Sequence, residues 1–142
     1  MWYRRGVPWG KVDLQNLVLL FALAGFIYGV IIFAPPVLDN LDVKEAIAIS
    51  LNQAHRLSDD EIKALIIART DDKGWHWEQN EIGEWVEVKG LGLTGDHIVI
   101  DRNTVTGVIT IRVNYERRVR FKPTQLTVSL SFSPEREALL HP

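Results

Sequence analysis

The residues in this chain with the chemistry for a metal or cofactor site are four histidines and a glycine-rich loop. The histidines are His55, His76, His97 and His141, and none has a second ligand at the spacing that metal sites use. Gly90-Leu-Gly-Leu-Thr-Gly95 has the letters of a dinucleotide-binding fingerprint. It does not open a helix within a strand–helix–strand unit, so we interpret it as a hairpin connection. We expect no metal and no cofactor.

Several classes of catalytic chemistry have no counterpart in the sequence. The chain has no cysteine, which excludes disulfides, thiolate nucleophiles and zinc–thiolate sites. It also has no Gly-x-Ser-x-Gly motif, no phosphate loop and no paired-carboxylate pattern. The sequence therefore predicts a protein that is not an enzyme.

A cluster of three tryptophans, Trp75, Trp77 and Trp85, falls within eleven residues. Indole rings at this density are suited to a ligand shelf or to a hot spot for a protein partner. The alternative is that the rings complete a thin core or touch lipid headgroups. Both interpretations stay open at the level of sequence.

A basic patch follows in the C-terminal half, formed by Arg117, Arg118, Arg120 and Lys122. It is a candidate contact for anionic lipid or for an acidic partner, and the alternative is a solvated strand end. Strict alternation would place Arg117 on the apolar side of its strand. We therefore expect a bulge or the rim of the sheet at that position.

Charge is distributed unevenly around the formal net charge of −2. Residues 39–101 carry 14 acidic and 6 basic side chains, a net charge of −8. Residues 102–142 carry 7 basic and 3 acidic side chains, a net charge of +4. This pattern indicates two differently charged surfaces, or two layers that attract each other. The acidic net charge of residues 39–101 disfavours binding to nucleic acid, whose phosphates are also negative.

These candidate residues all follow an apolar stretch, Leu14 to Leu38, which holds 25 residues without a charge. A bilayer core of about 30 Å needs about 20 apolar residues in a helix. We therefore expect a basic head at residues 1–13, a transmembrane helix at 14–38 and one α+β domain at 39–142.

The span has the features of an uncleaved signal anchor. Its apolar run is too long for a secretory signal, and no small-x-small cleavage site follows it. Arg4, Arg5 and Lys11 precede the span, whereas Asp39 and Asp42 follow it. The positive-inside rule then predicts a single-pass protein of the bacterial inner membrane, with a cytoplasmic N-terminus and a periplasmic domain. An interfacial aromatic belt is expected at Trp2, Tyr3 and Trp9.

A stripe of small residues, Ala22, Gly25 and Gly29, runs along the span. Small residues at this spacing let helix backbones approach closely, so the stripe is a candidate for helix packing, and lipid contact is the alternative. The span contains no ionisable residue. This argues against a proton path or an ion site within it.

Beyond the span, the sequence predicts two short helices. Pro35-Pro36 is expected to end or kink the membrane helix. An apolar periodicity predicts a second helix over Asp39–Arg56. Ser58-Asp-Asp-Glu61 is a capping box that opens a third helix, which we expect to end near Thr70.

The C-terminal half changes to the alternation that is typical of strands. Strands are predicted over Trp85–Lys89, His97–Asp101, Val108–Phe121 and Leu126–Ser133. We expect an antiparallel meander of three to four strands with one face covered by helices. Pro134 is expected to close the last strand and to leave residues 135–142 as a surface tail or a helical turn.

Three segments resemble a family of small single-span bacterial membrane proteins of unknown function. They are Ser58–Leu65, Val113–Phe121 with its Tyr-Glu-x-Arg-Val motif, and Leu126–Phe132. The resemblance implies a pilin-like order of helix and then sheet, and it implies no chemistry. Such proteins often begin like type IV pilins with a Gly-Phe-Thr-Leu-Ile sequence. This chain departs from that start, because Trp9-Gly10-Lys-Val-Asp-Leu-Gln15 has no glutamate five residues after Gly10.

The main hypothesis from the sequence is a non-enzymatic, membrane-anchored subunit that assembles or stabilises a larger membrane protein complex. Its partners would be other membrane protein subunits and the lipid bilayer. One alternative is a pilin-like filament or secretion component. Another is a periplasmic module that binds or senses a ligand on the tryptophans.

Overall fold

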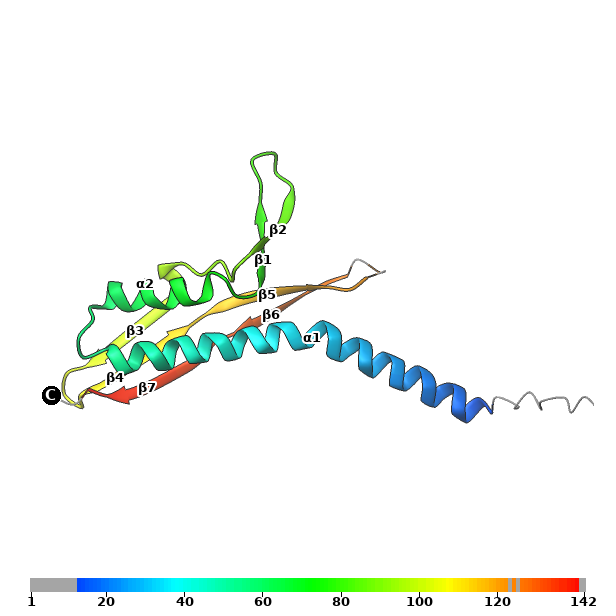
Figure 1. Cartoon of the computed structure of the whole chain (residues 1–142), viewed down its shortest axis with the longest axis horizontal. Coiled ribbons are helices and arrows are strands. Elements are labelled where there is room, and N and C mark those ends of the chain that lie inside the picture. The colour runs from blue at the N-terminus through cyan, green and yellow to red at the C-terminus, as the bar shows by residue number, and fades with distance from the viewer. Residues whose placement is uncertain (1–12, 123, 125, 141–142) are drawn as a thin grey trace, which may run out of the picture. The chain divides into compact units, whose positions relative to one another are not determined.

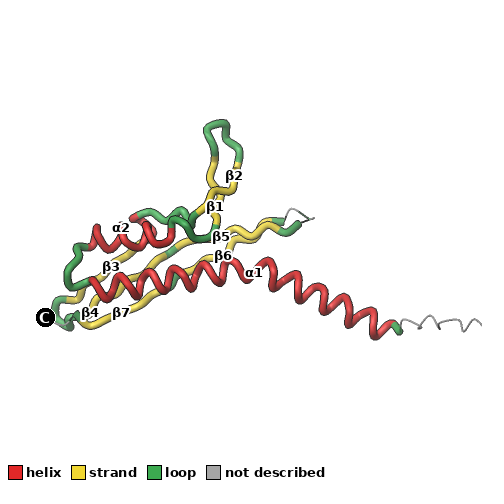
Figure 2. The backbone as a smooth tube through the Cα atoms, viewed as in Figure 1, coloured by secondary structure: helices red, strands yellow, loops and turns green. Residues whose placement is uncertain are grey.

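The computed structural model describes residues 13–122, 124 and 126–140, and its fold is α+β (Figures 1 and 2). Those residues form one long N-terminal helix, one short helix, and antiparallel strands arranged in small sheets. Almost all of the predicted basic head, including its aromatic residues, lies outside the described residues, as does His141. The chain divides into two compact units, with the boundary between Ile31 and Ile32.

Helix α1 (Leu14–Gln53) is 40 residues long and runs through Pro35 and Pro36 without a break. Of the two alternatives at these prolines, an end or a kink, the end is therefore wrong, as is the separate helix over Asp39–Arg56. Each proline removes one amide donor from the helix interior, which is costly. Tertiary packing offsets that cost, because the C-terminal half of α1 buries an apolar face in the domain core.

Helix α2 (Asp59–Thr70) confirms the predicted capping box. The Glu61 amide donates to Ser58 Oγ at 3.4 Å, and the Ser58 amide donates to Glu61 Oε2 at 2.8 Å. These two bonds satisfy amides that the first turn of a helix otherwise leaves without partners. The apolar side of α2 is buried through Ile62 and Ile66.

The predicted long strand over Val108–Phe121 is present as β4 (Val108–Val113) and β5 (Tyr115–Arg120), separated by Asn114. Strand β3 (Ile98–Asn103) follows a short 3-10 turn, η1 (Gly95–His97), and pairs with β4. Strand β6 (Thr127–Phe132) pairs with β5. All of these pairings are antiparallel, as the sequence predicts.

The C-terminal segment is a strand, β7 (Glu135–Leu139), which pairs with β4. The predicted surface tail or helical turn is therefore wrong. The reason is that Pro134 lacks an amide but still offers a carbonyl, which accepts a hydrogen bond from the Val113 amide at 3.0 Å. The pairing register continues across this point without a shift. Arg112 lies opposite Glu135, and Tyr115 lies opposite Phe132.

Strands β1 (Trp75–Gln79) and β2 (Trp85–Lys89) form a hairpin that projects from the rest of the domain (Figures 1 and 2). The second of these strands was predicted and the first was not. The described residues contain seven strands in three sheets, and β7 pairs back to β4. The arrangement is thus antiparallel, but it is not the simple meander of three to four strands that the alternation suggests.

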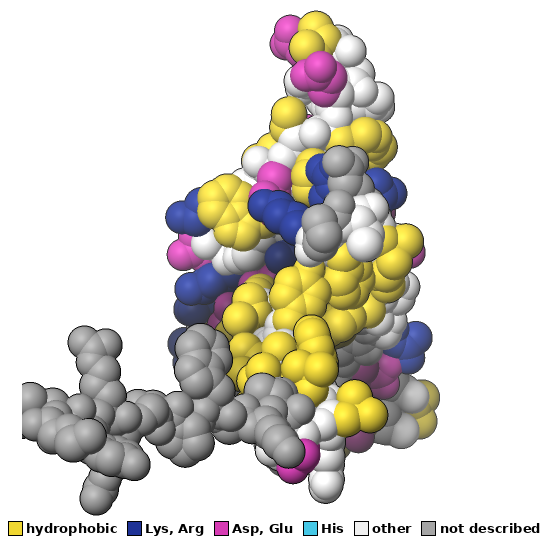
Figure 3. Space-filling view, turned by 90° about the vertical axis from the view of Figure 1, so that its right-hand side faces the viewer, with side chains coloured by type: hydrophobic (Ala, Val, Ile, Leu, Met, Phe, Trp, Pro, Cys, Tyr) yellow, Lys and Arg dark blue, Asp and Glu magenta, His cyan; other side chains and the backbone are white. Residues whose placement is uncertain are grey.

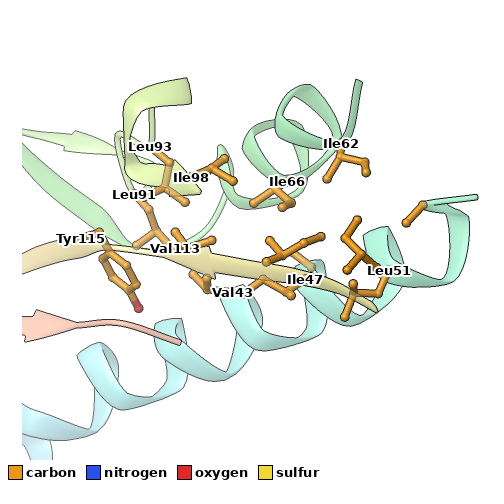
Figure 4. Close-up of a cluster of buried hydrophobic side chains, with 14 residues drawn as sticks. Val43, Ile47, Leu51, Ile62, Ile66, Leu91, Leu93, Ile98, Val113 and Tyr115 are labelled. Atoms are coloured by element: carbon orange, nitrogen blue, oxygen red, sulfur yellow. The ribbon is translucent and has the colours of Figure 1, made fainter. Parts of the chain in front are cut away.

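The core gathers apolar side chains from both helices and from the buried face of β4 (Figure 4). Val43, Ile47, Ile62, Ile109 and Ile111 are fully buried members of this one cluster. Leu91 and Leu93 enter it from the glycine-rich loop. Helices therefore cover one face of the sheet, and the opposite face of β5 is left exposed.

Candidate functional site

Arg117 does not belong to the surface patch predicted for it. It lies on the buried face of β5, and its Nη2 donates to Asp39 Oδ2 of α1 at 2.6 Å. The alternation of buried and exposed residues continues through this position, so the predicted bulge or sheet rim is wrong. Sequence patterning missed the arginine's partner because the two residues are 78 positions apart.

Burial alters the titration of the groups around this ion pair. It raises the pKa of the Asp39 carboxyl, and the Arg117 guanidinium opposes this shift without cancelling it. The neighbouring Tyr115 hydroxyl donates to Asn40 Oδ1 at 3.4 Å, and burial also raises the pKa of Tyr115. The Arg117 Nε is buried and has no hydrogen-bond partner among the described residues. This arginine thus serves to join helix and sheet.

Other predicted residues meet in a groove between the β1–β2 hairpin and β5–β6, namely Trp77, Trp85, Arg118 and Arg120. The larger part has a volume of about 750 Å³, and its lining includes Trp77, Trp85, Arg117 and Arg118. A second part of about 420 Å³ is lined by Trp77, Trp85, Arg118, Arg120, Thr127 and Ser129. The tryptophan cluster and the basic patch, predicted as separate features, therefore share one surface.

The three tryptophans lie on one face of the hairpin. Trp75 and Trp77 alternate along β1, and Trp85 pairs with Gln79, which continues the same alternation. Trp75 and Trp85 are 51% and 54% exposed, so these two rings do not complete a core. Trp75 is not among the residues that line the groove.

A cation–π contact between Trp85 and Arg118 joins the two predicted sets. The Arg118 guanidinium carbon lies 4.9 Å from the centre of the Trp85 ring. A cation over an indole face at this distance is attracted by the ring quadrupole. Arg118 and Arg120 are both exposed on the outer face of β5, and Lys122 is exposed in the following turn. Figure 3 shows Lys and Arg side chains gathered below the projecting hairpin.

Two histidines that the sequence left without a role also line the groove. His76 Nδ1 lies 2.8 Å from the carbonyl oxygen of Gly90. His97 Nδ1 accepts a hydrogen bond from the Thr94 amide at 3.0 Å. Both rings hold the glycine-rich loop in place. Spacing along the chain does not predict these two histidine contacts, because they form only when the glycine-rich loop is packed in the folded domain.

Within residues 13–122, 124 and 126–140, no three His, Asp or Glu side chains gather closely enough to hold a metal ion. The groove instead presents indole rings, guanidinium groups and backbone. These groups bind flat or anionic surfaces and extended chains.

The small-residue stripe of the span is open along its length. A methyl group added at Gly25 or Gly29 would meet nothing within 4 Å, and Ala22 is exposed. Among the described residues, α1 is the helix that is long and apolar enough to cross a membrane. All residues from Leu14 to Tyr28 are exposed. Comparison of the chain with protein-family models, with curated proteins and with solved structures finds no match.

Proposed function

We propose that this protein is a non-enzymatic, single-pass subunit that assembles or stabilises a larger membrane protein complex through its span and its α+β domain. One observation carries the proposal. A single unbroken helix supplies both the exposed apolar segment and the buried spine of the domain. An exposed apolar helix of this length is suited to contact with lipid or with the helix of another subunit.

The contact between Phe33 and Phe121 supports this arrangement. Their ring centres are 5.8 Å apart in an edge-on geometry. Phe33 belongs to the uncharged run, and Phe121 directly follows β5. The end of the β5–β6 hairpin thus lies beside the last turns of the apolar run. In a bilayer this would bring Lys122 near the headgroups, where a lysine is favoured.

The proposed setting is the bacterial inner membrane, with the N-terminus in the cytoplasm and the domain in the periplasm. The support is the positive charge before the span. The resemblance to small single-span bacterial membrane proteins of unknown function belongs to the same proposal. It rests on the short motifs named above.

Purification of the full chain from native membranes in a mild detergent, followed by mass spectrometry, tests the proposed function. We expect other membrane proteins in fixed stoichiometry with the chain. A chain that is isolated only as a lone monomer would overturn the proposal. A variant with Gly25→Leu and Gly29→Leu alters the span and leaves the domain unchanged, so less recovered partner in this variant would assign the association to the span.

A second candidate function is the binding of a small ligand in the groove. It is favoured by the volume of about 750 Å³, which falls within the range of roughly 300–1,000 Å³ for ligand sites. A pilin-like role has separate support in the long helix whose C-terminal half packs with an antiparallel sheet. Cleavage after Gly10 would support the pilin-like role, and an intact N-terminus in the mature protein would count against it.

A further inference from the structure

Strand β5 has a backbone edge with which no strand of the described residues pairs, although β1 contacts β5. Backbone hydrogen bonds of three residues establish the direction of the amides along this strand. Val113 and Phe121 donate to Pro134 and Leu126, on the side of β6 and β7, at 3.0 and 2.8 Å. Asn114 donates to His97, on the side of β3, at 2.8 Å. Because amides alternate along a strand, those of Glu116 and Arg118 point to the β3 side.

Strand β3 does not extend along this part of the sheet. It begins at Ile98, opposite Val113, and the chain before it turns away as η1. Among the described residues, β6 is the strand that pairs with β5. The groove of about 750 Å³ borders this edge at His97 and Asn114, and it extends over the outer face of β5 and β6 as far as Ser131. An uncovered strand edge is a template for another extended chain.

The far wall of the groove is the β1–β2 hairpin, which carries Trp77 and Trp85. A two-stranded hairpin alone is marginally stable in water. This hairpin also exposes apolar side chains, with Ile82 at 78% and Trp85 at 54%. A chain inserted between the hairpin and β5 would cover indole surface and would satisfy backbone groups of β5. Strand addition uses both of these effects, with main-chain hydrogen bonds for affinity and side-chain contacts for specificity.

The charge of the groove selects the chemistry of the inserted chain. Arg118 and Arg120 stand at alternate positions on the outer face of β5. Glu116 is the one carboxylate that lines the described groove, and its Oε2 already accepts from Ser129 Oγ at 3.2 Å. A paired strand with acidic residues at alternate positions would place its carboxylates opposite these arginines.

We propose that an extended, acidic segment of a partner protein adds to the free edge of β5 as a further strand, beneath Trp77 and Trp85. This inference names the partner surface for the proposed subunit and rests on that proposed function. Recognition would combine main-chain hydrogen bonds with pairing of opposite charges. Substitutions can test these two contributions separately.

The test uses the full chain in detergent micelles and a short labelled peptide of alternating threonine and glutamate. Fluorescence anisotropy of the peptide measures its dissociation constant. We expect the dissociation constant of this peptide to be lower than that of its threonine–lysine counterpart by a factor of about ten or more. We also expect binding to be lost when the peptide is N-methylated at alternate residues, because its edge amides are then blocked. Equal binding of the acidic, basic and methylated peptides would overturn the proposal.

Two matched pairs of variants separate backbone pairing from charge. Glu116→Pro removes an edge amide, whereas Glu116→Ala keeps it, and proline is tolerated on a strand where its missing amide faces away from the ladder. We expect only the proline variant to lose affinity for the acidic peptide. Arg118→Glu is expected to weaken binding about tenfold, and Arg136→Glu on β7 is expected to leave it unchanged. Equal loss in both members of a pair would contradict strand addition. A circular dichroism spectrum shows that each variant is folded.

Other occupants give distinct results. If the chain alone forms a dimer that Glu116→Pro abolishes, the edge pairs with a second copy and the acidic partner is wrong. If anionic vesicles bind in an Arg118-dependent manner and the acidic peptide does not, the ligand is a lipid headgroup. Recovery of a stoichiometric membrane complex without peptide binding would overturn this inference alone. Peptide binding by a chain that is otherwise always monomeric would overturn the proposed function instead.

Discussion

The Asp39 carboxylate and the Arg117 guanidinium form a buried ion pair, with Oδ2 and Nη2 separated by 2.6 Å. Asp39 belongs to α1 and directly follows the uncharged run, whereas Arg117 belongs to β5. The residues are only 7% and 8% exposed. The pair therefore joins α1 to β5, the strand that also forms one wall of the groove. Loss of the pair would affect both the packing of the helix on the sheet and the groove.

Removal of one partner of this pair should destabilise the domain strongly. Arg117→Ala or Asp39→Ala leaves a buried charge uncompensated, and we expect a loss of about 3–5 kcal/mol in the free energy of unfolding. Chemical denaturation of the full chain in detergent, followed by tryptophan fluorescence, measures it. Arg112→Ala is the control, because its ion pair with Glu135 is exposed and is worth about 1 kcal/mol or less.

Simultaneous replacement of both partners should cost far less than either single change. Asp39→Leu combined with Arg117→Met removes both buried charges together with the unpartnered Arg117 Nε. We expect a stability close to that of the unchanged protein. Denaturation midpoints of the two single variants and the double variant form a mutant cycle. Additive losses across this cycle would show that the two side chains do not interact.

Gly74 should tolerate no side chain, because it lies against Asp39. Its φ is +61°, and a Cβ built there would lie 2.6 Å from Asp39 Oδ2. Gly74→Ala thus combines backbone strain with a clash against the buried carboxylate. Gly83→Ala is the matched control. Its φ of +82° imposes similar strain, but its Cβ would meet only the flexible Gln79 side chain, at 3.5 Å. We expect the midpoint of thermal unfolding to fall further for Gly74→Ala. An equal shift in both variants would show that the clash with Asp39 does not contribute to the loss of stability.

The capping box of α2 should make stability depend on pH. Hydrogen bonds from the Ser58 amide and hydroxyl lower the pKa of the Glu61 carboxyl. Since the folded pKa lies below the unfolded one, the carboxylate stabilises the fold above the unfolded pKa. This contribution is lost as the pH falls through the folded pKa.

Replacement of the cap tests this assignment. Ser58→Ala is expected to cost about 1 kcal/mol at neutral pH and to flatten the acid limb of the stability profile. Denaturation at a series of pH values gives both quantities. Thr104→Ala, an exposed change in the turn before β4, is the control. An unchanged acid limb in Ser58→Ala would assign the pH dependence to other carboxylates.

The small-residue stripe of the span should be sensitive to added bulk. If another helix packs on Gly25 and Gly29, then leucine at both positions should weaken association about tenfold or more. Cross-linking in native membranes, with quantification of the captured partner, measures this. Ile27→Leu lies on the other side of the helix and should have no effect. Unchanged capture in the glycine variant would indicate that the stripe faces lipid.

Features of short range could be predicted from the sequence. The uncharged run, the capping box at Ser58 and the alternation along β4 and β5 all depend on neighbours within a turn or a strand. The same reasoning did not place Trp75 and Trp77 on one face, because no strand was predicted over Trp75–Gln79. It could not place Trp85 with them, because that requires the hairpin register that sets Trp85 opposite Gln79.

The candidate groove could be predicted only in its parts. The tryptophans and Arg118 were singled out by type, but their meeting depends on how a projecting hairpin lies against β5. The free edge of β5 has no sequence signal, because it arises where β3 leaves the sheet at His97.

The sequence by itself determined the apolar run, the start of α2 and the inward face of the long strand, since each is a periodic or local property. Tertiary structure alone decided that α1 passes through Pro35 and Pro36, that Arg117 turns inward to Asp39, and that β7 follows Pro134. The physical reason is the same in each case. The local preference against proline or buried charge costs a few kcal/mol, and long-range packing and pairing outweigh it.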